Sequence, residues 1–133
     1  MRYVCLIYDD EKKLGAMSKD EADGFMKAYF DFTEQIRASG NLIAGEALQP
    51  VHTTTSLRRR SGKLSTTDGP FMETKEQLGG FYLIEAGNLD EARKIAARIP
   101  SVETGTIEVR PVVDFSKQQE PPRAGKQAAT AAT

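Results

Sequence analysis

Residues 3–8 read Tyr-Val-Cys-Leu-Ile-Tyr, a run that is aliphatic or aromatic at almost every position. Such a run, with β-branched and aromatic side chains and little polar alternation, predicts a buried strand. Successive side chains of a strand point to opposite faces of its sheet. The strand therefore presents two apolar sets, one on each face: Tyr3, Cys5 and Ile7, and Val4, Leu6 and Tyr8.

A helix follows this strand after a polar turn at residues 9–13. Ser18 and Glu21 have the spacing of a capping box, in which two backbone amides at the helix start receive side-chain partners. Gly40 is a natural helix end. One apolar stripe at helical spacing lies between them: Ala22, Phe25, Met26, Tyr29, Phe32, Thr33 and Ile36.

The rest of the chain predicts a strand, a β-hairpin, a third long strand, a second helix capped by Asn88 and a final strand. These elements occupy residues 42–48, 54–60 with 63–67, 81–86, 88–100 and 107–113. We expect a bulge or a close approach of two strands at Gly45. Residues 68–71, Asp-Gly-Pro-Phe, predict a tight turn, and residues 71–78 an irregular charged segment.

This order is β-α-β, a hairpin, and β-α-β, which predicts an α+β fold of the ferredoxin-like split βαβ type with an inserted β-hairpin. Two short helices cover only one face of such a sheet, so the apolar second face needs another cover. The simplest cover is the same face of a second copy, related by a two-fold axis. The sequence therefore predicts a homodimer.

Composition narrows the class of protein. The 133 residues are enough for one domain, which we place at residues 1–115, with a disordered polar tail at residues 116–133. Nineteen acidic residues against 18 basic ones give a net charge of -1, which argues against nucleic acid as a partner. The single cysteine fits a reducing cytoplasm, and the short N-terminal apolar run argues against a signal peptide or a membrane association.

Residues 67–82, Thr-Asp-Gly-Pro-Phe-Met-Glu-Thr-Lys-Glu-Gln-Leu-Gly-Gly-Phe-Tyr, give the chain a family resemblance. With residues 6–8, residues 44–50 and residues 108–111, they resemble the DGPF proteins of the YCII-related family, which are dimeric α/β barrels. The resemblance covers residues 1–113 and implies a two-fold dimer whose sheets pack face to face.

The resemblance implies less about activity. Relatives are mostly uncharacterised, and some resemble a hydrolase-like group with a His-Asp pair whose histidine lies on the first helix. The predicted first helix here contains no histidine, so that pair cannot be transferred. DGPF relatives are also linked with extracytoplasmic-function sigma factors, which implies a regulatory context.

Asp68 is the candidate catalytic residue. On a rigid Gly-Pro turn at the mouth of a cleft, its carboxylate is suited to act as a general base or to bind a substrate. The competing interpretation is an aspartate that only stabilises its own turn by bonding to the backbone.

Five further residues are candidate ligand-binding residues: Tyr29, Phe71, Glu73, Lys75 and Glu76. The charged members follow Asp68 closely, and Lys75 is suited to hold an anionic group. The competing interpretations are a solvated charged loop, with ion pairs that contribute little, and aromatic residues that belong to the core or to a dimer interface.

No cofactor or metal is predicted. His52 is the only histidine and has no accompanying ligand set, so a surface loop position is favoured over a haem or metal ligand. Three consecutive arginines, residues 58–60, are expected to alternate between the faces of the hairpin, and Cys5 is expected to be an inert core thiol.

Two hypotheses of function remain. In the first, the protein binds a small molecule in a cleft near Asp68 and Phe71, with no reaction assigned. In the second, it is a non-enzymatic regulatory or interaction module that acts near an extracytoplasmic-function sigma factor. The first predicts that Asp68→Asn abolishes a ligand response, and the second predicts contacts through an exposed apolar patch or the basic hairpin.

Overall fold

The computed structural model describes residues 1–117. The predicted disordered tail, residues 116–133, lies outside the described residues except for its first two, which belong to the short 3-10 turn η2, Phe115–Lys117.

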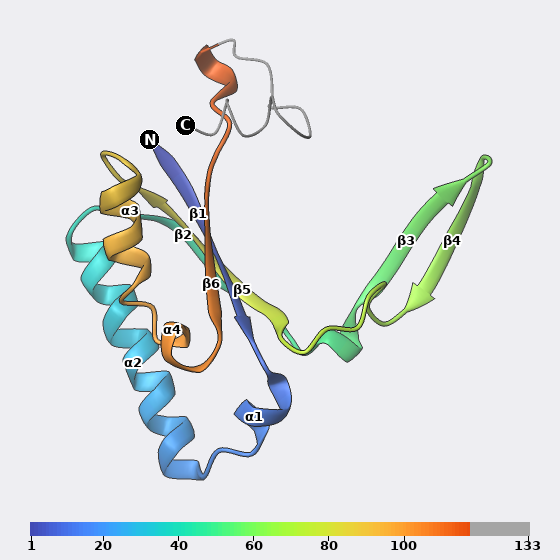
Figure 1. Ribbon diagram of the computed structural model, residues 1–133, viewed down its shortest axis with the longest axis horizontal. Coiled ribbons are helices and arrows are strands. Elements are labelled where there is room, and N and C mark those ends of the chain that lie inside the picture. The colour runs from blue at the N-terminus through green and yellow to red at the C-terminus, as the bar shows by residue number, and fades with distance from the viewer. Residues whose placement is uncertain (118–133) are drawn as a thin grey trace.

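A four-stranded antiparallel sheet forms the centre of the fold (Figure 1). Its strands are β1 (Arg2–Asp9), β2 (Leu42–Ala47), β5 (Gln77–Glu85) and β6 (Thr106–Pro111). They lie in the order β2-β5-β1-β6, so β1 and β5 are central and each βαβ unit spans one strand of the other. This order confirms the ferredoxin-like prediction.

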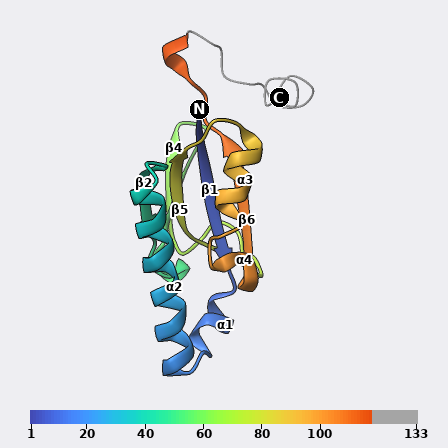
Figure 2. The same ribbon diagram turned by 90° about the vertical axis from the view of Figure 1, so that its left-hand side faces the viewer.

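Two helices, α2 (Lys19–Ala38) and α3 (Leu89–Ala96), lie on the same face of the sheet (Figures 1 and 2). The predicted capping box of α2 is present, since the Glu21 amide donates to Ser18 Oγ and the Ser18 amide donates to Glu21 Oε1. Asn88 caps α3 by accepting from the Glu91 amide. Both helix starts are therefore as the sequence predicts.

Two short helices were not predicted. Residues 9–13 are not a simple polar turn, because β1 continues to Asp9 and Asp10 caps α1 (Glu11–Gly15). Pro100 does not end the second helix, which stops at Ala96, but precedes α4 (Ser101–Thr104). Proline is compatible with a helix start, because the backbone amides of the first helical turn have no partner within the helix, so the lack of an N–H costs nothing there.

The core lies between the sheet and its two helices. It contains odd-numbered side chains of β1, even-numbered side chains of β5, the inner faces of α2 and α3, and Ile99 from the segment after α3. These residues are Tyr3, Cys5, Ile7, Phe32, Ile36, Tyr82, Ile84, Ala92, Ile95, Ala96 and Ile99. Cys5 is fully buried there, and burial raises the pKa of its thiol to about 11. This matches an unreactive core thiol.

Strand β5 begins at Gln77, four residues before the predicted start, so Gly79 and Gly80 lie inside the strand. A Cβ at Gly80 would lie 2.7 Å from the carbonyl oxygen of Glu46, so β2 can approach β5 closely only because Gly80 has no side chain. The predicted close approach at Gly45 is also present, because a Cβ there would lie 2.8 Å from the Tyr82 ring.

The predicted hairpin consists of β3 (Thr55–Arg60) and β4 (Lys63–Asp68), which form a separate two-stranded sheet. Ser61 and Gly62 make its turn with positive φ angles of 51° and 76°. The 3-10 turn η1 (Val51–Thr53) leads into it, and His52 is exposed in that turn. The hairpin projects from the side of the sheet opposite the helices (Figures 1 and 2).

Within residues 1–117, the second face of the four-stranded sheet carries no helix, and the sheet does not close into a barrel (Figure 1). We call this the open face. It consists of Val4, Leu6, Tyr8, Ala44, Glu46, Phe81, Leu83, Glu108 and Arg110. No helix within residues 1–117 is long and apolar enough to cross a membrane.

Candidate functional site

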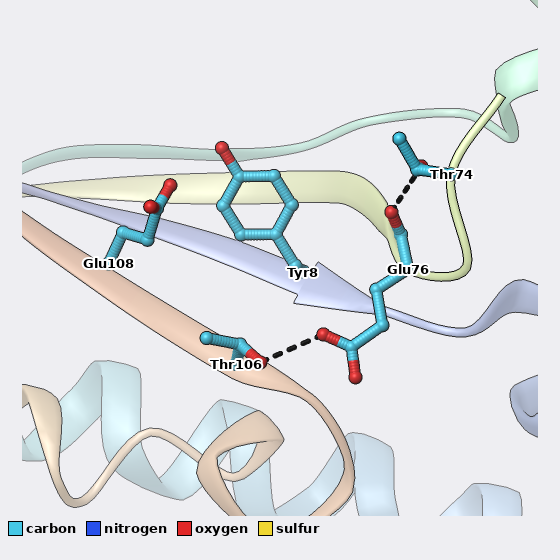
Figure 3. A pocket seen from close by; sticks show the side chains of 5 residues that line it. All are labelled: Tyr8, Thr74, Glu76, Thr106 and Glu108. Atoms are coloured by element: carbon cyan, nitrogen blue, oxygen red, sulfur yellow. Dashed lines mark hydrogen bonds between the residues drawn. The ribbon is translucent and has the colours of Figure 1, made fainter. Parts of the chain in front are cut away.

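A small hollow of about 320 Å³ lies at one end of the open face. Its lining comes from β1, from β6 and from the segment that leads into β5: Tyr8, Thr74, Glu76, Thr106 and Glu108 (Figure 3). The sheet register explains the arrangement, since Tyr8 lies opposite Thr106 on β6. We call this the acidic hollow.

Hydrogen bonds fix the wall formed by Glu76. Thr106 Oγ1 donates to Glu76 Oε1 at 2.8 Å, and the Thr74 hydroxyl donates to the backbone carbonyl of Glu76 (Figure 3). The side-chain amide of Gln77 donates to the Thr74 carbonyl at 2.6 Å. This loop is therefore anchored to β6 and to itself although it contains no regular secondary structure.

The hollow is rich in hydrogen-bond acceptors. Within residues 1–117, neither Glu76 nor Glu108 forms an ion pair with a basic side chain. The Tyr8 ring lies between these two carboxylates (Figure 3). A ligand that supplies hydroxyl or amine donors matches this lining, whereas an anion would be repelled by both carboxylates.

The Tyr8 phenol has the Glu108 carboxylate as its neighbour in this site. The pKa of Tyr8 is raised, first by this carboxylate as a nearby acceptor for the phenol proton, and then by burial and by the negative charge of Glu108. The positive charge of Arg110 opposes them. The phenol therefore keeps its proton at neutral pH, because its ordinary pKa is already about 10.

A second polar group, which we call the Asp9 cluster, lies on the helix side of the sheet. Asp9 is 6% exposed and accepts hydrogen bonds from the hydroxyls of Ser101 and Thr104, the latter at 2.6 Å. The Tyr29 hydroxyl bonds to Ser101. The cluster joins the end of β1 to α2 and α4, and each of its buried side-chain oxygens has a partner.

Tyr29, one of the candidate ligand-binding residues, therefore lies half-buried on the covered side of the sheet. Burial raises the pKa of Tyr29 to about 12, although its bonds to Ser101 act in the opposite direction. Asp9 and Tyr8 are neighbours in β1 and point to opposite faces. Tyr29 and the acidic hollow are thus separated by the sheet.

Asp68 is the last residue of β4 and has an exposed side chain at the base of the hairpin. The Gly69 amide donates to the Thr54 carbonyl at 2.6 Å, which extends the pairing of β3 with β4 by one residue pair, and the chain bends at Gly69, where φ is +99°. Among the described residues, no backbone hydrogen bond closes a tight turn across residues 68–71, so the predicted turn is present only as a bend. The structure does not bring Asp68 and Tyr29 together, because the hairpin and α2 project from opposite sides of the sheet (Figure 1).

Among the remaining candidates, Glu76 alone lines the acidic hollow. Glu73 and Lys75 are exposed on the preceding loop. Phe71 is 69% exposed and lies beneath the guanidinium of Arg58, 5.7 Å from the ring centroid. Within residues 1–117, no hydrogen bond or ion pair joins Glu73 or Lys75 to Asp68 or to the acidic hollow.

Sequence reasoning did not select four residues of the hollow, Tyr8, Thr74, Thr106 and Glu108. The alternation of β1 did place Tyr8 on the second face of the sheet. The missing information was the pairing of β1 with β6, which sets Thr106 and Glu108 beside Tyr8 across a separation of about a hundred residues. Within residues 1–117, no three histidine, cysteine or acidic side chains are grouped closely enough to hold a metal ion.

These features define a ferredoxin-like α+β domain with helices on one sheet face and a small acidic hollow on the other. The chain belongs to the YCII-related family, since the YCII-related domain matches residues 1–116.

Two known proteins are similar to this chain. An uncharacterised protein of Rhizobium meliloti (strain 1021) is 37% identical over 123 residues, which cover 91% of this chain and 99% of that protein. The solved structure of 5-chloro-2-hydroxyhydroquinone dehydrochlorinase from Burkholderia phenoliruptrix AC1100, in complex with 2,5-dihydroxybenzoquinone, is similar with a TM-score of 0.51. It is 15% identical, and the match covers 88% of this chain and 98% of that one, so the likeness is one of fold.

Proposed function

We propose that this protein binds a small neutral or cationic molecule with several hydroxyl or amine donors in the acidic hollow. The observation that supports this most directly is the pair of carboxylates, Glu76 and Glu108, on either side of the Tyr8 phenol. A volume of about 320 Å³ lies at the small end of the range for ligand sites.

Hydroxylated aromatic compounds are the first class to test. Their hydroxyl groups can donate to the two carboxylates, and the Tyr8 ring offers an aromatic surface for the ring itself. No reaction is assigned to the hollow.

The test is a thermal-shift screen against hydroxylated aromatics, polyols and polyamines, with Glu108→Gln and Asp68→Asn in parallel. A ligand at about 100 times its Kd should stabilise the wild-type protein by about 2.7 kcal/mol. Loss of a hydrogen bond to a charged group should weaken binding by roughly tenfold or more, so Glu108→Gln should lose most of the shift. Positive ligands would then be incubated with the protein and examined for products.

Asp68→Asn serves as the matched control, because it changes one carboxylate in the same way at the base of the hairpin. A shift that persists in Asp68→Asn and disappears in Glu108→Gln supports the acidic hollow. The reverse pattern would contradict this proposal and favour a site at the Asp68 turn.

We also propose a homodimer formed through the open face. The central strands expose part of Val4, Leu6, Phe81 and Leu83 there, with no helix over them. In a two-fold dimer each copy would cover the other, which is the economical way to bury one sheet face of identical subunits.

A regulatory contact with an extracytoplasmic-function sigma factor is the second candidate function. The observation that favours it is the exposed basic hairpin, which presents Arg58, Arg59, Arg60 and Lys63. Co-purification of such a sigma factor with the wild-type protein, lost when the hairpin arginines are changed to glutamate and kept in Asp68→Asn, would support it. Co-purification that is unchanged when the hairpin arginines become glutamate would contradict it.

A further inference from the structure

The β3–β4 hairpin makes few contacts with the rest of its own chain that could stabilise it. Of its twelve strand residues, only Ser56 is partly buried. Its base is held by the bond from the Gly69 amide to the Thr54 carbonyl and by the bond from Ser56 Oγ to the Gly69 carbonyl, at 2.6 and 2.7 Å. A two-stranded ribbon of this kind is marginally stable by itself in water, so a surface that supports it is expected.

The two faces of the hairpin differ in character. The register sets Leu57 opposite Thr66 and Leu64 opposite Arg59, so the two leucines lie diagonally on one face. They are 60% and 55% exposed. The other face carries Arg58, Arg60 and Lys63. The hairpin thus offers a small apolar face and a strongly basic face.

The hairpin extends on the same side of the molecule as the open face. Both views show it on the far side of the sheet from α2 and α3 (Figures 1 and 2). Strands of six residues reach about 20 Å, and sheets that pack face to face lie about 10 Å apart. A second copy that packs on the open face would therefore lie within reach of the hairpin.

The charges of the two surfaces are complementary. Residues 55–68 carry four basic side chains and one acidic side chain, for a net charge of +3. The hollow end of the open face carries Glu76 and Glu108, with Glu46 opposite Phe81 on the neighbouring strand. Complementary charges of this kind favour one docking register over others and suppress association with the wrong surface.

We propose that the hairpin of each copy docks on the other copy of a two-fold dimer and places its basic residues over the partner's acidic hollow. This rests on the homodimer of the proposed function. The partner would then contribute arginine or lysine side chains to each hollow. A ligand held there would meet acceptors from one chain and cationic donors from the other.

The experiment is a charge exchange between two variants of the full chain. One variant carries Arg58→Glu and Arg60→Glu on the hairpin, and the other carries Glu76→Lys and Glu108→Lys in the hollow. In each variant alone, like charges meet at both contacts of the dimer, so its dimer Kd should rise at least tenfold. In an equal mixture of the two, both contacts are complementary, and a heterodimer should form with an affinity close to that of the wild type.

Sedimentation velocity and native mass spectrometry give the readout, without any ligand. Arg93→Glu with Lys94→Glu is the matched control, because it reverses two exposed basic residues on α3, on the helix side of the sheet. It should leave the dimer Kd within about twofold of wild type, because interface charges act through local contacts. Circular dichroism would check that each variant is folded like the wild type.

Recovery of the dimer on mixing supports the proposal. A wild-type chain that stays monomeric, hairpin variants that dimerise like the wild type, or weakened variants that do not recover on mixing would each overturn it. A monomer whose hairpin charges retain another protein would instead support the regulatory candidate. This experiment measures the mass of the assembly and the thermal-shift screen measures ligand binding. A failure of the docking proposal can therefore be told apart from a failure of the ligand-binding proposal.

Discussion

At the scale of single residues, Asp9 shows how the fold uses a buried charge. The carboxylate is almost fully enclosed and accepts hydrogen bonds from Ser101 and Thr104. A buried carboxylate is costly unless such donors are supplied. The Asp9 cluster therefore fixes α4 against the end of β1, which also positions the start of β6 beside Tyr8 in the hollow.

The close packing around this cluster can be tested at Gly105. A Cβ at this position would lie 1.9 Å from the carbonyl oxygen of Tyr8 and 2.6 Å from Asp9 Oδ1. Because both contacts are far shorter than van der Waals distance, Gly105→Ala should lower the free energy of unfolding by about 1–3 kcal/mol in urea denaturation.

Gly24→Ala is the control for this prediction. Gly24 lies in α2, and a methyl group added there would have no neighbour within 4 Å, so the change should stabilise the protein by about 0.5–1 kcal/mol. Equal effects of the two substitutions would contradict the packing around Gly105.

Tyr29 gives a prediction about alkaline pH. Its pKa is raised to about 12, so the folded protein holds the phenol proton more tightly than the unfolded chain, whose tyrosines titrate near pH 10. The stabilisation is fully present below about pH 10 and is lost as the pH rises toward about 12. Tyr29→Phe should therefore lose less stability than the wild type between about pH 8 and about pH 11.

Urea denaturation at these two pH values measures the difference. The variant should be less stable than the wild type near neutral pH, because the hydrogen bond between the Tyr29 and Ser101 hydroxyls is lost. Part of the alkaline loss should remain, since burial also raises the pKa of Cys5 and Tyr82. An unchanged loss of stability in Tyr29→Phe would show that this phenol does not contribute.

At the scale of elements, α2 has its start fixed by local chemistry and its position fixed by the core. Its N-terminal turn is closed by the reciprocal bonds between Ser18 and Glu21. Phe32 and Ile36, nearer its C-terminal end, are the residues that the core buries. The first turns therefore depend on the cap more than on packing.

Ser18→Ala tests this dependence. It removes the acceptor of the Glu21 amide and should lower the free energy of unfolding by about 1 kcal/mol. Lys19→Ala, one residue further and highly exposed, should change it by less than about 0.5 kcal/mol. Equal losses in the two variants, measured by thermal or urea unfolding, would show that the capping box contributes little.

At the scale of the whole molecule, the covered and open faces of the sheet differ in what they carry. The covered face holds the core, and the open face holds half-buried apolar residues with the acidic hollow at one end. The proposed dimer would bury the apolar part and turn the hollow into an internal site between two copies.

Leu83→Lys tests the dimer at the centre of the open face. A lysine there can remain solvated in a monomer but would be buried without a partner in the proposed interface, so the dimer Kd should rise at least tenfold. Glu103→Lys, on the exposed side of α4, should leave the Kd unchanged. Sedimentation equilibrium measures both, and a dimer that tolerates Leu83→Lys would contradict an interface through this face.

Local signals in the sequence were enough to predict the order of the strands and of the two main helices, the caps of those helices and the two-sided apolar character of β1. Capping boxes, turn glycines and strand alternation act over a few residues, so the predictions at Ser18, Asn88, Ser61 and Gly62 were confirmed. The ferredoxin-like fold followed from the order of these local signals.

Which polar residues meet depends on contacts between distant parts of the chain. The pairing of β1 with β6 brings Glu108 beside Tyr8, and the docking of α4 brings Ser101 to Asp9. In the sequence, Asp9 looks no different from the polar residues that follow it. Its burial could not be predicted, because the hydrogen-bond donors that make burial possible lie about ninety residues away. Strand register and helix docking are set by packing of the core between residues far apart in sequence. Glu76 was predicted because it lies close to Asp68 in the sequence, whereas its neighbours in the hollow could not be predicted without the strand register.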